Sequence, residues 1–214
     1  MRVFLILVLV GVAALLGAVA LLASEPEAGG GTLAASMSLG GESAQPVYSI
    51  IDVTTYDVTG TTEEELFRSL HAHGPRSEGR EFFGLMESEM AFRYWKTPSD
   101  TGCRLEQIRL DLHLVITLPR WDAPREAPYR LRRDWGRFET ALRRHEDEHR
   151  KIAEHNAKEI YHALRSIRTP TCDTIDAEAH AVTERLRAEG DARQQRFDRR
   201  TGHGRTQGAV WPQR

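Results

Sequence analysis

The chain has 214 residues, of which 40% are hydrophobic and 28% charged, and its formal net charge at pH 7 is -2. These values are typical of a soluble globular domain with room for a terminal appendage. A charge balance so close to neutral gives no reason to expect nucleic acid or an acidic membrane surface as a partner.

The N-terminal segment has a different composition. Arg2 is followed by an uninterrupted apolar run over residues 3–23, which is long enough to span a bilayer as a helix. Alanines near the end of the run would also permit its cleavage as a signal peptide. We therefore expect residues 1–23 to form a membrane anchor or signal helix, with the rest of the chain exported and periplasmic, or anchored and facing the exterior. The alternative is a helix buried in the core.

A linker and a single folded domain follow. Residues 24–46 are rich in Gly, Ala, Ser and Glu, which is typical of a flexible tether. The domain is expected to cover residues 47–204, with residues 205–214 as a C-terminal tail. Its two cysteines, Cys103 and Cys172, indicate a disulfide if the chain is exported, whereas two free buried thiols would be expected in the cytosol.

Strand patterns come first in the domain. Residues 47–60 are dense in β-branched and aromatic side chains and end at a glycine. Residues 82–95 and 104–118 alternate apolar with polar side chains, and the turn at 98–102 joins them as an antiparallel hairpin. Because one face is apolar and the other polar, we expect a small antiparallel sheet that is covered on one side.

A short helix is predicted between the first two strands. Thr61 and Glu64 fit a capping box at its start, and Gly74 followed by Pro75 ends it.

Two longer helices are predicted after the hairpin, over about 129–167 and 175–199, with Pro170 in the break between them. Strands followed by long helices indicate an α+β domain, in which both helices cover one face of the sheet.

The first long helix contains the sequence His-Glu-Asp-Glu-His at residues 145–149. On a helical wheel His145 and His149 fall within the apolar stripe, and Glu146 lies at its edge. Two histidines one turn apart can bind a single Zn²⁺, and the glutamate between them can act as general base toward water. A single inward histidine is more often a core residue, but two beside a glutamate are costly to bury without a function. The sequence therefore predicts His145 and His149 as zinc ligands and Glu146 as the catalytic base.

A third histidine on this helix, His155, is not expected to bind the metal. One large zinc-protease clan uses a histidine at this spacing, but it needs a glycine where this sequence has Ile152. Without that helix break, His155 falls on the polar side of the wheel.

The third ligand is expected from the second long helix or beyond it. Glu178 lies at the edge of that helix's buried stripe. After the helix, His203 lies between Gly202 and Gly204, whose backbone can approach a metal closely. Both residues stay open as ligands at this point, and His203 is equally consistent with an ordinary tail histidine.

Several segments together resemble a bacterial family identified as predicted secreted or periplasmic zinc-dependent proteases and catalogued as a domain of unknown function. The resemblance covers residues 47–204 and rests on the segments YDVTGTTEEELFRSL, HGP, FFGLMESEMAFRYW, GCRLEQIRLDLHLVITLPRW, HEDEHR and FDRRTGHG. It implies a zincin-like fold, His203 as the third ligand beside the two helix histidines, and a disulfide between the cysteines. It also implies that Asp198 and Thr201 fix the ligands or their loop.

The first functional hypothesis is a zinc metallopeptidase of the cell envelope that acts on a peptide or protein substrate, and that contacts the membrane through its N-terminal helix if this is not cleaved. The alternatives are a non-catalytic envelope module with a structural zinc site and a zinc amidase that acts on peptidoglycan. Structural zinc sites usually use cysteines, and here both are expected to be bonded to each other.

Overall fold

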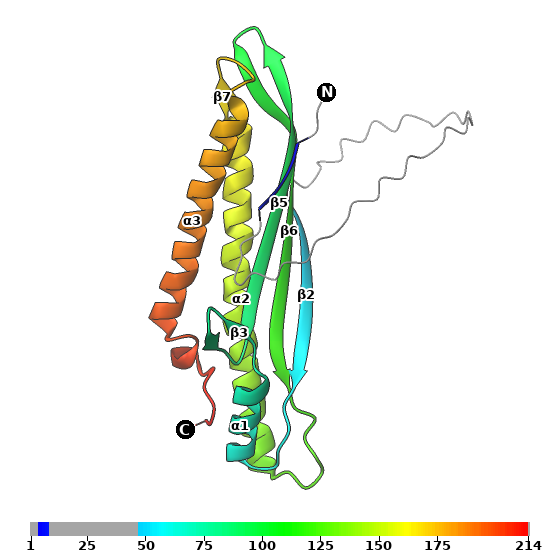
Figure 1. Ribbon diagram of the computed structural model, residues 1–214. Helices are drawn as coiled ribbons and strands as arrows, with labels where there is room; N and C mark the ends of the chain where they lie inside the picture. Colours follow the sequence, from blue (N-terminus) through cyan, green and yellow to red (C-terminus); the bar gives the residue numbers. More distant parts are fainter. Residues whose placement is uncertain (1–3, 9–46, 214) are drawn as a thin grey trace, which may run out of the picture.

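The computed structural model describes residues 4–8 and 47–213 (Figure 1). The strands are β1 Phe4–Val8, β2 Val47–Asp57, β3 Arg76–Ser77, β4 Arg80–Glu81, β5 Leu85–Ser99, β6 Gly102–Arg120 and β7 Arg168–Thr169. The helices are α1 Glu63–His73, α2 Tyr129–Ser166, α3 Ile175–Thr201 and the 3₁₀ helix η1 Arg205–Gln207. Strands and helices are largely segregated along the chain, so the α+β class is confirmed.

The sheet is mixed rather than antiparallel. β5 and β6 form the predicted antiparallel hairpin, with Ser99 opposite Gly102 at the turn. β2 pairs with the other side of β6 in parallel, with Val47 opposite Leu110. The order is β1-β5-β6-β2, and β7 pairs with the start of β6. The prediction of a purely antiparallel sheet was wrong, because alternation of side chains identifies the two faces of a strand but not its direction.

The expected N-terminal helix falls mostly outside the described residues, as does the linker at 24–46. Where the structure describes the segment, Phe4–Val8 is a strand that pairs antiparallel with β5, Phe4 opposite Tyr94 and Val8 opposite Met90. An edge strand such as β5 offers unpaired N–H and C=O groups to an added strand, which accounts for this pairing. Among the described helices, none has the length and apolar character needed to cross a bilayer.

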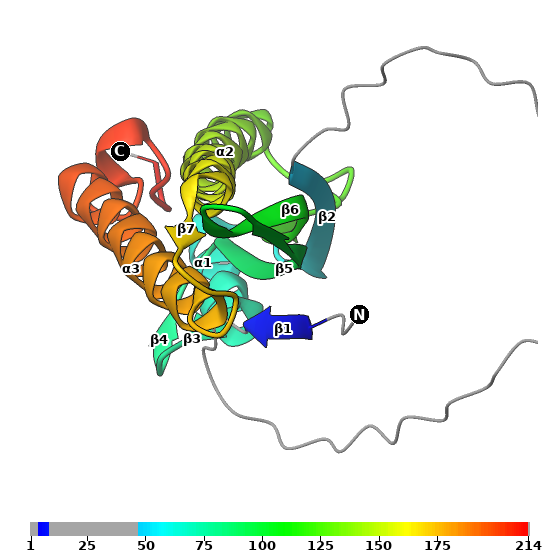
Figure 2. The ribbon, with the colours of Figure 1, turned by 90° about the horizontal axis from the view of Figure 1, so that it is seen from above.

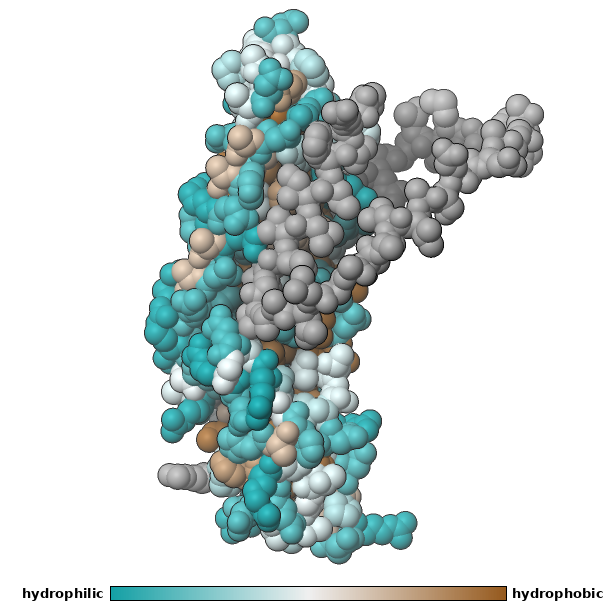
Figure 3. All heavy atoms as spheres, in the orientation of Figure 1, coloured by the Kyte–Doolittle hydropathy of each residue, from teal (hydrophilic) through white to brown (hydrophobic). Residues whose placement is uncertain are grey.

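Both long helices lie on one face of the sheet, side by side and antiparallel to each other (Figures 1 and 2). Leu110, Leu112 and Leu114 of β6 face α2 and are at most 1% exposed. Burial of each such side chain stabilises the fold by about 1.5–3 kcal/mol. The opposite face has ion pairs at the surface, such as Arg109 with Asp111. Coverage of the sheet on a single side is therefore confirmed, and the view in Figure 3 is largely hydrophilic over α3.

Helix α1 begins one residue later than the capping-box pattern predicts. Thr62 is the N-cap, and its hydroxyl accepts from the Glu65 backbone while the Glu65 carboxylate accepts from the Thr62 backbone. The Thr61 backbone N–H also donates to Glu65. Both Thr61 with Glu64 and Thr62 with Glu65 fit the capping-box motif in sequence. Glu65 is the residue whose carboxylate reaches the free N–H groups of Thr61 and Thr62. The helix ends at Gly74 as predicted.

The predicted disulfide is present. Cys103 at the start of β6 is bonded to Cys172 in the loop between α2 and α3. The bond therefore ties the α2–α3 connection to the sheet at the end of the molecule where β7 also pairs with β6.

Candidate metal centre

Helices α2 and α3 together hold two histidine rings. His145 and His149 lie one turn apart on the buried face of α2 and are 4% and 8% exposed. Phe197 of α3 packs against both rings, with centroid distances of 5.0 Å to His145 and 4.9 Å to His149. The ring of Phe197 is stacked on His145 and perpendicular to His149, so both imidazole planes are fixed by packing.

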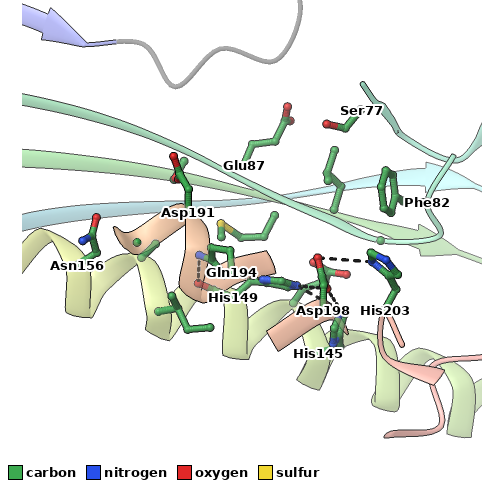
Figure 4. Close-up of a pocket in the computed structure, with 18 of the residues that line it drawn as sticks. Ser77, Phe82, Glu87, His145, His149, Asn156, Asp191, Gln194, Asp198 and His203 are labelled. Atoms are coloured by element: carbon green, nitrogen blue, oxygen red, sulfur yellow. Dashed lines mark hydrogen bonds and ion pairs between the residues drawn. The ribbon is translucent and has the colours of Figure 1, made fainter. Parts of the chain in front are cut away.

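The Nε2 atoms of these histidines converge on one carboxylate oxygen (Figure 4). The two Nε2 atoms are 3.3 Å apart. Oδ1 of Asp198, from the last turns of α3, is 3.3 Å from Nε2 of His145 and 3.0 Å from Nε2 of His149. These three residues form a group that could hold a metal ion, with ligand atoms all within 4.8 Å of one another.

Two glutamines contact the Nδ1 atoms of the two histidine rings and orient the rings. Nδ1 of His149 is 2.6 Å from Oε1 of Gln194, and Nδ1 of His145 is 2.9 Å from Oε1 of Gln207. The amide of Gln194 also donates to the backbone carbonyl of His149, which fixes Oε1 toward the ring. Each Nδ1 therefore carries a proton and donates it, which leaves the Nε2 lone pair facing Asp198. No sequence pattern pointed to these glutamines, because a single amide forms no recognisable motif.

This arrangement needs a positive charge at its centre. Two imidazole lone pairs and a carboxylate oxygen face one another, and without a proton or a cation between them they repel. When a proton lies between these atoms, an Nε2–H of His145 or His149 donates to Asp198. Burial acts to raise the pKa of Asp198, but these hydrogen bonds outweigh it and hold that pKa well below its ordinary value. Two imidazole nitrogens and a carboxylate oxygen are also a ligand set typical of a divalent transition metal. The residues present therefore fit a metal ion.

Glu146 lies in the same pocket, on the side of β5. It is 4% exposed, and its carboxylate lies near the Met86 backbone, which acts to lower its pKa. A Cβ atom at Gly84 would lie only 2.9 Å from Oε1 of Glu146, so the glycine leaves room for the carboxylate. Burial raises the pKa of Glu146 to about 6, although the charges of His149 and His145 act to lower it. A carboxyl group with this pKa can exchange a proton near neutral pH.

His203 lies at the edge of this group rather than inside it. Its Nδ1 is 3.5 Å from Oδ2 of Asp198, the carboxylate oxygen that faces away from the two histidines, and its side chain is 51% exposed. Asp198, which the resemblance places in a supporting role, instead provides the atom that meets both Nε2 atoms. The assignment of His203 as third ligand stays a prediction.

The loop after α3 is held close to the histidines. Thr201 accepts a hydrogen bond from the Gly204 backbone and donates to the Phe197 carbonyl. Gly204 has φ 79°, and a Cβ atom there would lie 3.1 Å from Cγ of His145. These contacts join Thr201 to the loop, and Gly204 permits the close approach. The role of Thr201 in supporting the site stays a prediction.

The structure does not bring Glu178 or His155 to the site. Glu178 is exposed and lies 20 residues before Asp198 on α3, about 30 Å along the helix axis. The side chain of His155 is 66% exposed and pairs with Glu159 at 3.4 Å. The wheel thus placed His155 on the correct side of α2.

The candidate centre opens into a cavity of about 280 Å³. Its walls are the start of β5 and one side of α3, and α2 lies beneath them (Figure 4). His145, His149 and Asp198 lie at one end of the cavity, which extends along α2 as far as Asn156. A cavity of this size can receive a few residues of an extended chain or a small ligand.

Residues 53–204 match the family described as "Bacterial protein of unknown function (DUF922)", which covers most of the described chain. No curated protein and no solved structure matches the chain.

Proposed function

The chain belongs to the DUF922 family of bacterial proteins, and we propose that it is a zinc-dependent metallopeptidase of the cell envelope. The observation that carries the proposal is the convergence of two Nε2 atoms and one carboxylate oxygen beside the buried carboxyl group of Glu146. The location in the envelope rests on the apolar run at residues 3–23 and on the disulfide.

The ion would be held by Nε2 of His145, Nε2 of His149 and Oδ1 of Asp198, with His203 as the other candidate for the third position. When bound, Zn²⁺ supplies a Lewis acid that polarises the peptide carbonyl and makes water more acidic. Asp198 provides one negative charge toward the ion, and the two glutamines keep both imidazoles in the tautomer that leaves Nε2 free.

Glu146 moves the proton. Its carboxylate takes a proton from the attacking water while the water oxygen bonds to the peptide carbonyl carbon. The same carboxyl group then gives that proton to the amide nitrogen as the C–N bond breaks, so Glu146 ends the cycle ionised. Its buried position beside the Met86 backbone keeps the carboxyl group at the base of β5, next to the cavity.

The edge of β5 is where we expect the peptide to lie. Among the described residues, β1 pairs only with residues 90–94 of β5, and no strand pairs with residues 85–89 on that side. An extended peptide can add to such an edge through main-chain hydrogen bonds. This part of the edge begins beside Glu146, so an added strand would pass the catalytic carboxyl group.

Metal removal and restoration test the proposal on the purified full-length chain. We expect about one equivalent of zinc, loss of peptide cleavage after treatment with a chelator, and recovery on adding zinc back. Absence of bound metal would contradict the proposal. Zinc without cleavage would indicate a structural site, and cleavage of peptidoglycan stem peptides alone would indicate an amidase.

Gln194 is expected to be needed for tight zinc binding. Replacement of Gln194 with methionine removes the acceptor of the His149 Nδ1–H bond, and we expect zinc affinity to fall by about 10- to 100-fold. Competition with a chromophoric chelator measures this change. Gln195→Met, at the exposed neighbouring position, is the matched control. The Gln194→Glu variant should bind more tightly than Gln194→Met, because a carboxylate still accepts from Nδ1; unchanged affinity in Gln194→Met would refute this role.

A further inference from the structure

The side of α3 that faces the cavity is polar along its length. Arg187, Asp191, Gln194 and Asp198 all line the cavity and follow one another at helical spacing. Figure 4 places the last three in succession along the helix beside the histidines. Gln194 and Asp198 belong to the candidate metal centre. Arg187 and Asp191 line the part of the cavity that lies farther along α3 from that centre.

Arg187 is paired with a glutamate on the same helix. Its Nη1 atom is 2.8 Å from Oε1 of Glu184. Asp191 is exposed at the rim of the cavity and has no hydrogen-bond or ion-pair partner within the part of the chain that the structure describes. Neighbouring atoms partly desolvate its carboxylate and raise its pKa, although Arg187 acts to lower it. An unpaired carboxylate at the rim of a cavity is stabilised by an incoming cation.

The cavity next to Asp191 suits the stem of a long basic side chain. Ile152 and Ala153 of α2 and Met90 of β5 line it with apolar surface. The methylene groups of lysine or arginine can lie on such a surface while the charged end reaches a carboxylate. Asp191 precedes Asp198 by seven residues, about 10 Å along α3. A long side chain on a residue close to the scissile bond spans most of that distance.

We propose that Asp191 is a specificity-determining residue that selects peptides with a lysine or arginine close to the scissile bond. The inference rests on the proposed function, since it places the scissile bond at the metal group. The expected ligand is therefore a basic peptide in extended conformation that pairs with residues 85–89 at the edge of β5.

Binding to an inactive, zinc-loaded full-length Glu146→Gln protein tests the inference without relying on turnover. The probes are short fluorescent peptides of neutral residues, with either one lysine or one norleucine placed in turn at each position. Fluorescence anisotropy should show about fivefold tighter binding of the best lysine peptide than of its norleucine counterpart, which is the contribution of a partly exposed ion pair. Adding Asp191→Asn should remove most of this difference. Glu178→Gln, at an exposed position on the same helix, is the matched control and should leave the difference unchanged.

The outcomes separate this inference from the proposed function. Equal binding of lysine and norleucine peptides, or a lysine preference that survives Asp191→Asn, would overturn the inference. A lysine preference that Asp191→Asn removes, in a protein that cleaves no peptide when Glu146 is intact, would support a subsite for a basic side chain at Asp191 and contradict the proposed peptidase activity. Zinc content is measured in every variant, so that loss of the metal is not mistaken for loss of the subsite.

Discussion

Replacement of Glu146 with glutamine is expected to lower the rate of peptide cleavage by a factor of about 10²–10⁴ and to leave the zinc content unchanged. Glutamine has nearly the shape of glutamate and still fits the space beside Gly84. It cannot take a proton from water, so only the proton transfer is removed. The measurement is kcat for a fluorogenic peptide, with zinc determined on the same samples.

The matched control for this experiment is Glu148→Gln, two residues along the same helix. The Glu148 carboxylate is paired with Lys151 at the surface, so its loss should change neither cleavage nor zinc content. If Glu146→Gln cleaves as fast as the unaltered chain and still holds zinc, Glu146 is not the base. If it loses zinc, the glutamate contributes to metal binding, and the proton-transfer role has to be assigned to another group.

Helical periodicity could predict which side chains of α2 face inward, and this is why His145, His149 and Glu146 are correctly placed. Each of the three depends only on local geometry, since one turn of a helix brings residues four apart onto the same face. The strands of the hairpin were also predictable from local geometry, because the alternating leucines of β6 identify its buried face.

The position of Asp198 beside the two histidines could not be found in this way, because it depends on how α3 packs against α2. Phe197 packs on both histidines, and its neighbour Asp198 is thereby brought beside their Nε2 atoms. Close approach of the helices depends on Gly190, where a Cβ atom would lie 2.6 Å from the Asn156 side chain. Such contacts between helices leave no periodic pattern in the sequence. A histidine between two glycines was therefore the more visible candidate.

The direction of β2 was hidden for a related reason. Its β-branched and aromatic residues predict a strand but not the direction of that strand, and the pairing with β6 depends on the route of the chain through α1 and the hairpin. Parallel and antiparallel neighbours differ in backbone hydrogen bonding, which side-chain patterns do not report.

A matched pair of asparagine variants, Asp198→Asn and His203→Asn, is expected to identify the third zinc ligand. Asparagine at position 198 keeps the shape of the side chain but removes the negative charge that faces both Nε2 atoms. We expect zinc affinity to fall by more than the roughly 10- to 100-fold that loss of a supporting residue causes. His203 has φ 53°, a backbone conformation that asparagine tolerates well, so His203→Asn should leave the loop intact. The His203 ring contacts Oδ2 of Asp198, the oxygen that faces away from the two histidines. Loss of the His203 ring should therefore weaken zinc binding by no more than loss of a supporting residue does.

Competition titration with a chromophoric chelator, performed on both variants at one pH, gives the order of the two losses. The order of the two losses matters more than either value, since the His203 ring contacts the Asp198 carboxylate and the two changes are therefore not independent. A larger loss in His203→Asn would contradict the assignment of Asp198. It would mean that the imidazole of His203 turns inward when zinc binds, and that Asp198 then supports it through the contact between Nδ1 and Oδ2.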